Sequence, residues 1–97
     1  MNDPKRLNKE AVCAMVTLIA QMLVDYPDAV SVEAVTTQEV TTLNVRAAPA
    51  DTGKLIGKQG RTARSIRTLV SGAGMKLHHR YALNIVKPEG TEEAPPA

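Results

Sequence analysis

Leu55-Ile56-Gly57-Lys58-Gln59-Gly60-Arg61 is the stretch of sequence that decides the fold, because two glycines flank two long polar residues directly after an apolar pair. Glycine has no Cβ, so a phosphate can approach its backbone closely and unusual dihedral angles are open to it. A helix that begins directly after such a loop presents unpaired backbone N–H groups and the positive end of its dipole. The stretch therefore predicts an anion-binding loop between two helices, with Lys58 supplying a charge and Gln59 an amide.

Two nucleotide-binding motifs do not fit this loop. A Walker A loop has four residues between its glycines and then Lys followed by Ser or Thr, whereas three residues separate Gly53 from Gly57 and Gln59 follows Lys58. The dinucleotide-binding pattern Gly-x-Gly-x-x-Gly needs a glycine where Leu55 stands. A bare Gly-x-x-Gly is common in turns, so the loop takes its meaning from the segments around it.

An amphipathic helix is predicted directly after the loop, from Arg61 to about Ala73, ending near Gly72 or Gly74. At about 100° per residue, one side of this helix collects apolar residues that suit a core, namely Ala63, Ile66, Leu69, Val70 and Ala73. Arg61, Arg64 and Arg67 centre on a direction about 150° away. The planar guanidinium gives bidentate hydrogen bonds to phosphate, so this outward stripe extends the anion-binding surface.

The chain before the loop predicts one helix and two strands. The apolar residues of the helix recur at steps of three and four, and they are Leu7, Ala11, Met15, Leu18, Ile19 and Met22. Pro27 ends this helix. Strands are predicted over residues 30–35 and 40–48, with Leu43, Val45 and Ala47 on one face of the second.

A short helix over residues 52–56, N-capped by Asp51, and a last strand over residues 80–86 complete the predicted elements. The order is α-β-β-α-α-β, and the fold class is α+β. We expect a three-stranded mixed sheet with three helices packed on one face. The last two strands are joined through the helical pair, so they should be parallel if they are neighbours.

The distribution of charge separates the two halves of the chain. The protein has 97 residues and a net charge of +2, yet residues 52–88 hold eight basic side chains and no acidic one. Such a localised field attracts a polyanion. The single Cys13 excludes an intramolecular disulfide and a cysteine-based zinc cluster. No apolar run approaches membrane-spanning length, and we expect a cytoplasmic protein without a cofactor, metal, small-molecule substrate or catalytic residue.

The segment Ile56-Gly57-Lys58-Gln59-Gly60, set between two helices after an apolar strand, resembles the signature of a KH domain. The helix and strand ahead of it resemble the type II arrangement. Residues 23–28, 48–54 and 57–68 are similar to the stand-alone bacterial KH proteins of the KhpA family. The resemblance covers residues 7–87, with residues 1–6 expected to be a flexible N-terminus and residues 88–97 a disordered, acidic, Pro-rich tail.

This resemblance implies a groove that holds about four single-stranded nucleotides, with the Gly-x-x-Gly loop clamping the backbone. The loop before the last strand, residues 74–80, would border the other side of the groove. The predicted RNA-binding residues are Lys54, Ile56, Gly57, Lys58, Gln59, Gly60, Arg61, Arg64, Arg67, Lys76 and Arg80. His78 and His79 lie in the same loop, but adjacent strand residues point to opposite faces and no third metal ligand is evident.

The resemblance also implies a partner and a role in the cell. Such proteins pair with a larger KH-containing protein of the KhpB or Jag type. Separately from the resemblance, a homodimer is expected to raise the apparent affinity for RNA through multivalency. The resemblance further implies that such proteins act as RNA chaperones or post-transcriptional regulators that affect cell length and cell-wall homeostasis. Two functions remain open at this point: direct binding of single-stranded RNA, or a protein-interaction module in which contact with RNA is secondary.

Overall fold

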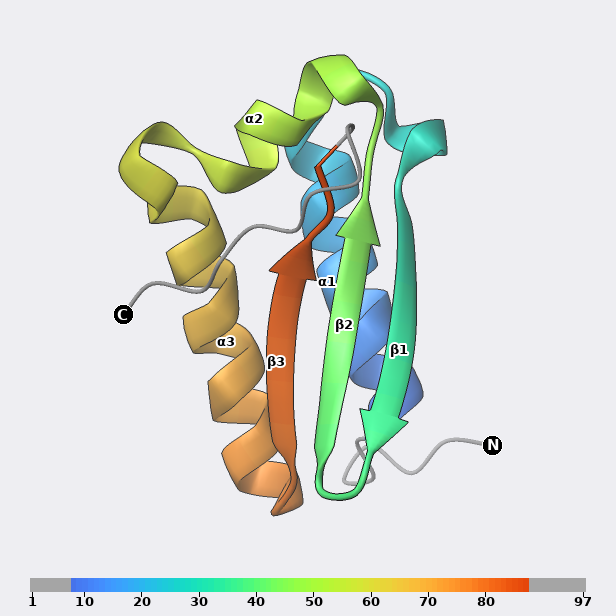
Figure 1. The fold of residues 1–97 in the computed structure, drawn as a ribbon, viewed down its shortest axis with the longest axis vertical. Helices are drawn as coiled ribbons and strands as arrows, with labels where there is room; N and C mark the ends of the chain where they lie inside the picture. Colours follow the sequence, from blue (N-terminus) through green and yellow to red (C-terminus); the bar gives the residue numbers. More distant parts are fainter. Residues whose placement is uncertain (1–7, 88–97) are drawn as a thin grey trace.

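The computed structural model of the chain describes residues 8–87, which form a three-stranded sheet with three helices (Figure 1). The elements follow the predicted order α-β-β-α-α-β, and they are α1 (Lys9–Leu23), β1 (Ser31–Thr37), β2 (Val40–Arg46), α2 (Thr52–Ile56), α3 (Arg61–Leu77) and β3 (Arg80–Ile85). The sheet order is β1-β2-β3, with β1 antiparallel to β2 and β2 parallel to β3. The predicted fold class and the parallel pairing of the last two strands are therefore confirmed.

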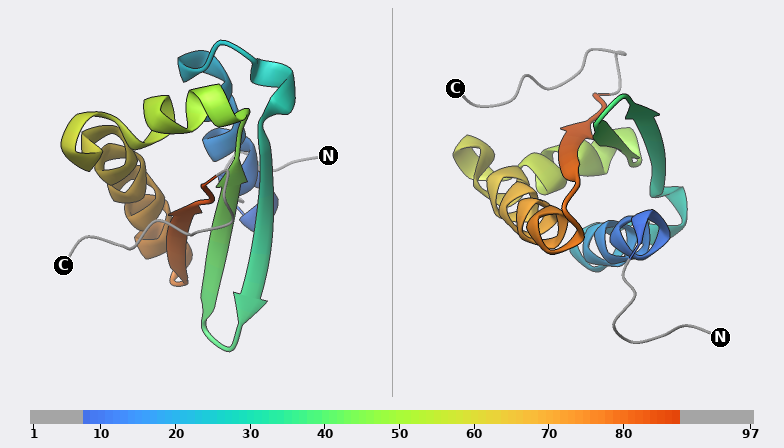
Figure 2. Two further views of the ribbon diagram at one scale, coloured as in Figure 1. Left: turned by 45° about the horizontal axis from the view of Figure 1, so that its top comes forward. Right: turned by 90° about the horizontal axis from the view of Figure 1, so that it is seen from below.

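One face of the sheet carries the core, because strand register brings apolar residues side by side. Leu43 of β2 pairs with Ala34 of β1 on one side and with Leu83 of β3 on the other. Successive side chains of a strand point to opposite faces, so these three share a face. Helices α1 and α3 lie over this face (Figure 2), and α2 closes the layer at one end. The inward face predicted for β2 is therefore correct.

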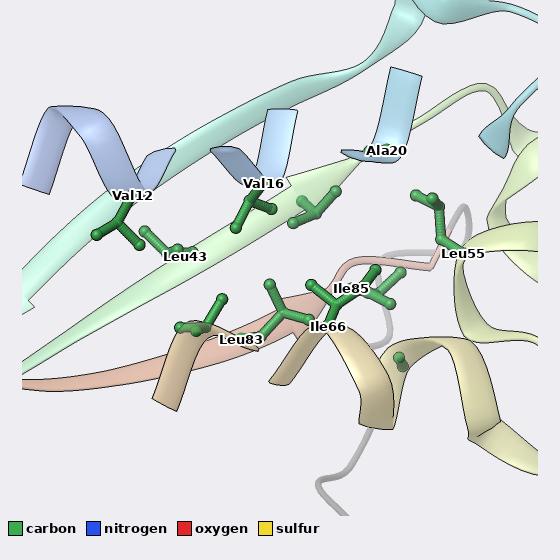
Figure 3. Close-up of a cluster of buried hydrophobic side chains, with 11 residues drawn as sticks. Val12, Val16, Ala20, Leu43, Leu55, Ile66, Leu83 and Ile85 are labelled. Atoms are coloured by element: carbon green, nitrogen blue, oxygen red, sulfur yellow. The ribbon is translucent and has the colours of Figure 1, made fainter. Parts of the chain in front are cut away.

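The core consists of aliphatic side chains from α1, β2, α2, α3 and β3, with the partly buried Val32 and Ala34 of β1 packed against it, since the chain has no Phe or Trp (Figure 3). Leu43 is completely buried and lies beside Val12 of α1 (Figure 3). Leu55 of α2 is also buried. The fully buried aliphatic set is Val12, Val16, Ala20, Leu43, Val45, Leu55, Ala63, Ile66, Val70, Leu83 and Ile85.

The side of α1 that packs on the sheet differs from the predicted side. The buried residues are Val12, Val16 and Ala20, whereas the exposed fractions of Leu18 and Met22 are 58% and 77%. Helix α1 has apolar residues on nearly every side, so periodicity alone does not select the packed side. Asn8 is the N-cap of this helix, and its side chain accepts a hydrogen bond of 2.9 Å from the backbone N–H of Ala11.

Helix α3 runs one turn further than predicted, because neither Gly72 nor Gly74 ends it. The helix ends at Leu77, and the C-cap residue His78 has a left-handed φ of 56°. Gly74 is buried, and a Cβ at this position would lie 2.5 Å from the carbonyl oxygen of His79. The glycine therefore allows the chain to return closely past the helix. Leu69, predicted to face the core, has 53% of its surface exposed.

The observed strand limits differ slightly from the predicted ones: β1 begins and ends later, while β2 and β3 end earlier. The predicted flexible segment 1–6 and the predicted tail 88–97 lie outside the described residues. Within residues 8–87, no helix is long and apolar enough to cross a membrane.

Candidate nucleic-acid interface

The loop between α2 and α3 has a backbone shape that depends on both glycines. Gly57 adopts φ 79° and ψ 170°, a combination essentially restricted to glycine. Its Cα lies so close to Thr62 that an added Cβ would be 2.7 Å from the Thr62 Cβ and 2.8 Å from its backbone nitrogen. Gly60 adopts a left-handed φ of 75°, with open space around it. Position 57 thus requires glycine because of both its dihedral angles and its close contact with Thr62. Position 60 favours glycine because of its dihedral angles alone.

Lys58 and Gln59 form the exposed tip of this loop. Gln59 adopts a left-handed φ of 57°, a conformation that only a few per cent of residues other than glycine adopt. Two arginines of the first turns of α3 reach back to this residue. Arg64 donates a hydrogen bond of 3.3 Å to the Gln59 carbonyl oxygen, and Arg61 lies 3.5 Å from its side-chain oxygen. The loop therefore carries three positive charges around one turn of backbone.

The N-terminus of α3 begins directly at this loop. Gly60 is its N-cap and contributes no side-chain hydrogen bond, and the first turn holds no acidic residue. The N–H groups at the start of a helix have no partner within the helix, and the helix dipole places a partial positive charge there. Together with the exposed cations Lys58 and Arg61, this geometry is electrostatically favourable for an anion such as a phosphate.

Arg67 differs from the other two arginines of the predicted stripe. It is half-buried, and its Nε donates a long hydrogen bond of 3.4 Å to the carbonyl oxygen of Leu83. Leu83 belongs to β3, the edge strand beside α3. Arg67 therefore links helix to strand between the loop and the far end of α3, whereas Arg61 and Arg64 contact the loop.

Asp51 anchors the helix that leads into the loop, and it occupies the predicted N-cap position of α2. Its buried carboxylate makes no capping hydrogen bond. Instead it accepts hydrogen bonds of 2.9 Å from the Tyr26 N–H and 3.2 Å from the Asp25 N–H. Desolvation raises the pKa of Asp51, but the two N–H donors and Lys54 outweigh it and hold the pKa below its usual value.

Lys54 completes this anchor on α2. Its Nζ lies 3.3 Å from an Asp25 carboxylate oxygen and 3.4 Å from an Asp51 carboxylate oxygen. The side-chain hydrogen bond and charge of Asp25, followed by Asp51, raise the pKa of Lys54. Sequence reasoning missed this network because the contacts of Asp51 and Lys54 with residues 25 and 26 join segments more than twenty residues apart.

Lys76 and Arg80 lie at the opposite end of α3 from the loop (Figure 1). Helical rise places Lys76 about 20 Å further along the axis than Arg61. Both side chains are exposed. A hollow of about 490 Å³ lies beside Arg80, between α3 and the start of β3. The predicted residues thus form two clusters at the two ends of one helix, while Ile56 is half-buried against the core.

The two histidines of the α3–β3 connection have separate structural roles. His78 takes the left-handed position that ends α3. The His79 Nε2 lies 2.8 Å from the buried Thr41 hydroxyl, which in turn lies 2.9 Å from the Thr36 hydroxyl. Within residues 8–87 there is no group of three His, Cys, Asp or Glu side chains placed to hold a metal ion.

Comparisons with known proteins agree with this architecture. A family model described as "KhpA/KhpB, KH domain" matches residues 14–85. The curated RNA-binding protein KhpA of Clostridium acetobutylicum is 46% identical over 68 residues, which are 70% of this chain and 91% of the relative. KhpA of Bacillus subtilis is 44% identical over 71 residues, covering 73% of this chain and 88% of the relative.

A solved structure shows the same fold at low sequence identity. The crystal structure of Era from Aquifex aeolicus aligns with a TM-score of 0.62 and 16% identity. The alignment covers 82% of this chain and 31% of that protein. This likeness concerns the fold alone.

Proposed function

Because the chain belongs to the KhpA/KhpB family of KH domains, we propose that it binds single-stranded RNA through the loop Gly57–Gly60 and the N-terminus of α3. The observation that carries the proposal is the backbone of Gly57, whose shape only glycine allows and which leads into a helix start without a side-chain cap. The family is one of RNA-binding domains, not of enzymes.

In this proposal a phosphate approaches the bare backbone of the loop and accepts hydrogen bonds from N–H groups in the first turn of α3 beyond Arg61, whose own N–H donates to the Lys58 carbonyl oxygen. Lys58, Arg61 and Arg64 add charge around it. Lys54 and Arg67 support the geometry, since one fixes α2 through Asp25 and Asp51 and the other ties α3 to β3. These contacts involve the sugar-phosphate backbone, which all sequences share, so we infer low sequence specificity.

The test is a double charge reversal at the tip of the loop. Lys58→Asp with Gln59→Asp should abolish binding to a labelled oligoribonucleotide. The variant removes the positive charge of Lys58, and the two new carboxylates repel a phosphate from the loop backbone. The matched control is Lys9→Asp with Gln38→Asp, which changes the net charge equally at two exposed positions outside the loop. Wild-type affinity in a folded loop variant, measured by fluorescence anisotropy, would refute direct binding through this loop.

A role as a protein-interaction module is the second candidate, and one observation favours it. Helix α1 and the turn after it expose large apolar side chains, namely Leu18, Met22, Leu23 and Tyr26. Exposed apolar groups gathered on one element often mark an interaction surface. We extend the proposal to a partner that binds this surface, either a KH-containing protein of the KhpB or Jag type or a second copy of this chain. In this extension the protein is a cytoplasmic RNA chaperone that affects cell length and cell-wall homeostasis.

This extension has its own test. Leu18→Ser with Met22→Ser should weaken association with such a partner in sedimentation velocity experiments, because the apolar area buried on binding is lost. The same variant should retain RNA binding by the isolated chain. Unchanged association would place the contact on another surface.

A further inference from the structure

The last residues of the chain carry a charge opposite to that of the surface around the loop Gly57–Gly60. Residues 52–88 hold eight basic side chains and no acidic one, whereas residues 89–97 hold three glutamates and no basic residue. This acidic segment, residues 89–97, contains no large apolar side chain. Charge is therefore the property by which it can select a surface of the fold.

Strand β3 brings the chain back to the end of α3 at which the loop lies. It runs antiparallel to α3 (Figure 1), and the hydrogen bond from the Arg67 Nε to the Leu83 carbonyl oxygen joins the two elements. From Arg67 the helix covers about 9 Å back to Arg61. From Leu83 the chain covers up to about 13 Å in the same direction to Lys87, the last described residue. Lys87 therefore lies near the level of the first turn of α3.

Three cations at this end of α3 are accessible to the acidic segment. These loop cations, Lys58, Arg61 and Arg64, are all exposed. The two arginines make polar contacts with Gln59, which bring them to the loop without neutralising them. Among residues 8–87, no carboxylate forms an ion pair with any of the three. A carboxylate that reaches them therefore meets charge that this part of the chain leaves uncompensated.

The acidic segment is long enough to reach the loop cations. A chain advances at most about 3.3–3.6 Å per residue, so Glu89 can lie up to about 7 Å from Lys87 and Glu93 up to about 20 Å. A short tether gives its free end an effective concentration on the order of millimolar near the rest of the chain. Weak individual ion pairs are therefore sufficient for a contact.

We propose that the acidic segment is an internal competitor for the RNA-binding loop, in which Glu89, Glu92 and Glu93 pair with the loop cations and leave when a phosphate binds. The effect on RNA binding rests on the proposed function, whereas the contact itself does not. Because the ion pairs are exposed, they weaken as salt rises. A strand that brings several phosphates displaces all three carboxylates together, whereas a single anion does not.

The first experiment removes the negative charge and keeps the length of the chain. Glu89→Gln with Glu92→Gln and Glu93→Gln should strengthen binding of an eight-nucleotide oligoadenylate by at least about threefold at low salt. The reason is that three exposed ion pairs each favour the docked segment by a factor of about 1.4 or more. The gain should disappear at high salt, where exposed charges are screened.

The control variant makes the same change of net charge elsewhere. Glu10→Gln with Glu33→Gln and Glu39→Gln alters three exposed positions in α1, β1 and the turn after β1. A gain in affinity of the first variant that does not exceed the gain of this control overturns the inference, because it would come from net charge alone.

Amide chemical shifts recorded without RNA test the contact independently of RNA binding. At low salt, the backbone amides of residues 58–64 should differ between the wild type and the variant with Gln at 89, 92 and 93, and at high salt they should coincide. Coinciding spectra at low salt overturn the contact. Differences that grow with protein concentration also overturn it, because they assign the segment to a neighbouring copy.

The loop variant Lys58→Asp with Gln59→Asp separates this inference from the proposed function. Wild-type RNA affinity in that variant defeats RNA binding through the loop, whatever the amide shifts show. Loss of RNA binding in that variant, together with coinciding spectra at low salt, defeats the contact of the acidic segment alone.

Discussion

Replacing Gly57 by alanine tests most directly whether the shape of the loop is imposed by its backbone. The dihedral angles of Gly57 lie where a residue with a Cβ is strained by about 1–3 kcal/mol. The new Cβ would also meet the Cβ and nitrogen of Thr62 at 2.7 and 2.8 Å. Overpacking of this kind costs a further ~1–3 kcal/mol. The free energy of unfolding should therefore fall by about 2–6 kcal/mol, a large share of the stability of a small domain.

Two other glycines provide matched controls in the same segment. Gly60 has a left-handed φ but open space around it, so Gly60→Ala should cost only about 1–2 kcal/mol. Gly53 lies within α2 with nothing near an added Cβ, so Gly53→Ala should stabilise the fold by about 0.5–1 kcal/mol. Urea unfolding followed by circular dichroism measures all three.

The order of the three effects decides the outcome. If Gly57→Ala destabilises no more than Gly60→Ala, the contact with Thr62 does not constrain the loop and the reasoning fails. Thr62→Ala should rescue Gly57→Ala only in part, because it removes the Thr62 Oγ1 nearest the added Cβ, whereas the Cβ and the backbone nitrogen of residue 62 remain in place.

Three further predictions concern the anchor of α2, the end of α3 and the charge of the surface. The pKa of Asp51 is lowered on folding from its usual 3.8, so its contribution to stability is complete above that value and is lost as the pH falls through the lower folded pKa. Asp51→Asn should therefore flatten the loss of stability at acid pH measured in urea melts. An equally steep loss in the wild type and the variant would contradict this. Gly74→Ala should destabilise by about 1–3 kcal/mol because its Cβ would lie 2.5 Å from the His79 oxygen, whereas Gly72→Ala, with open space, should stabilise by about 0.5–1 kcal/mol; similar thermal shifts in both would refute the close approach. RNA affinity should fall with salt, and Lys58→Ala should reduce the slope of log affinity against log salt by about 0.7; an unchanged slope would show that Lys58 contacts no phosphate.

The local parts of this fold can be predicted from the sequence. The short helix α2 was expected at its observed bounds, because Pro49 and Asp51 precede it and Gly57 follows it within a few residues. The alternating pattern of β2 likewise identified its inward face, since a strand with one buried face shows a period of two. In both cases the pattern that predicts the element is contained in a few consecutive residues of the sequence.

The features that sequence reasoning missed depend on distant contacts. Gly74 looks like a helix stop, yet it lies inside α3. A glycine is needed there because the returning chain at His79 passes where a Cβ would lie. Asp51 looks like a helix cap, yet its partners are backbone groups of residues 25 and 26. The packed side of α1 is decided by the sheet against which it lies, since most sides of the helix are apolar.

The structure also changes what the basic segment means for binding. Of its eight basic side chains, Lys54 is held by two carboxylates and Arg67 donates to a strand carbonyl. Charges already engaged within the fold gain less from a phosphate, because the existing partner must be given up first. Removing them would therefore alter the positions of α2 and α3 before it altered attraction to RNA. A loss of binding in a Lys54 or Arg67 variant consequently counts as evidence for contact only when the fold and the stability of that variant are unchanged, whereas the exposed Lys58 can be tested directly.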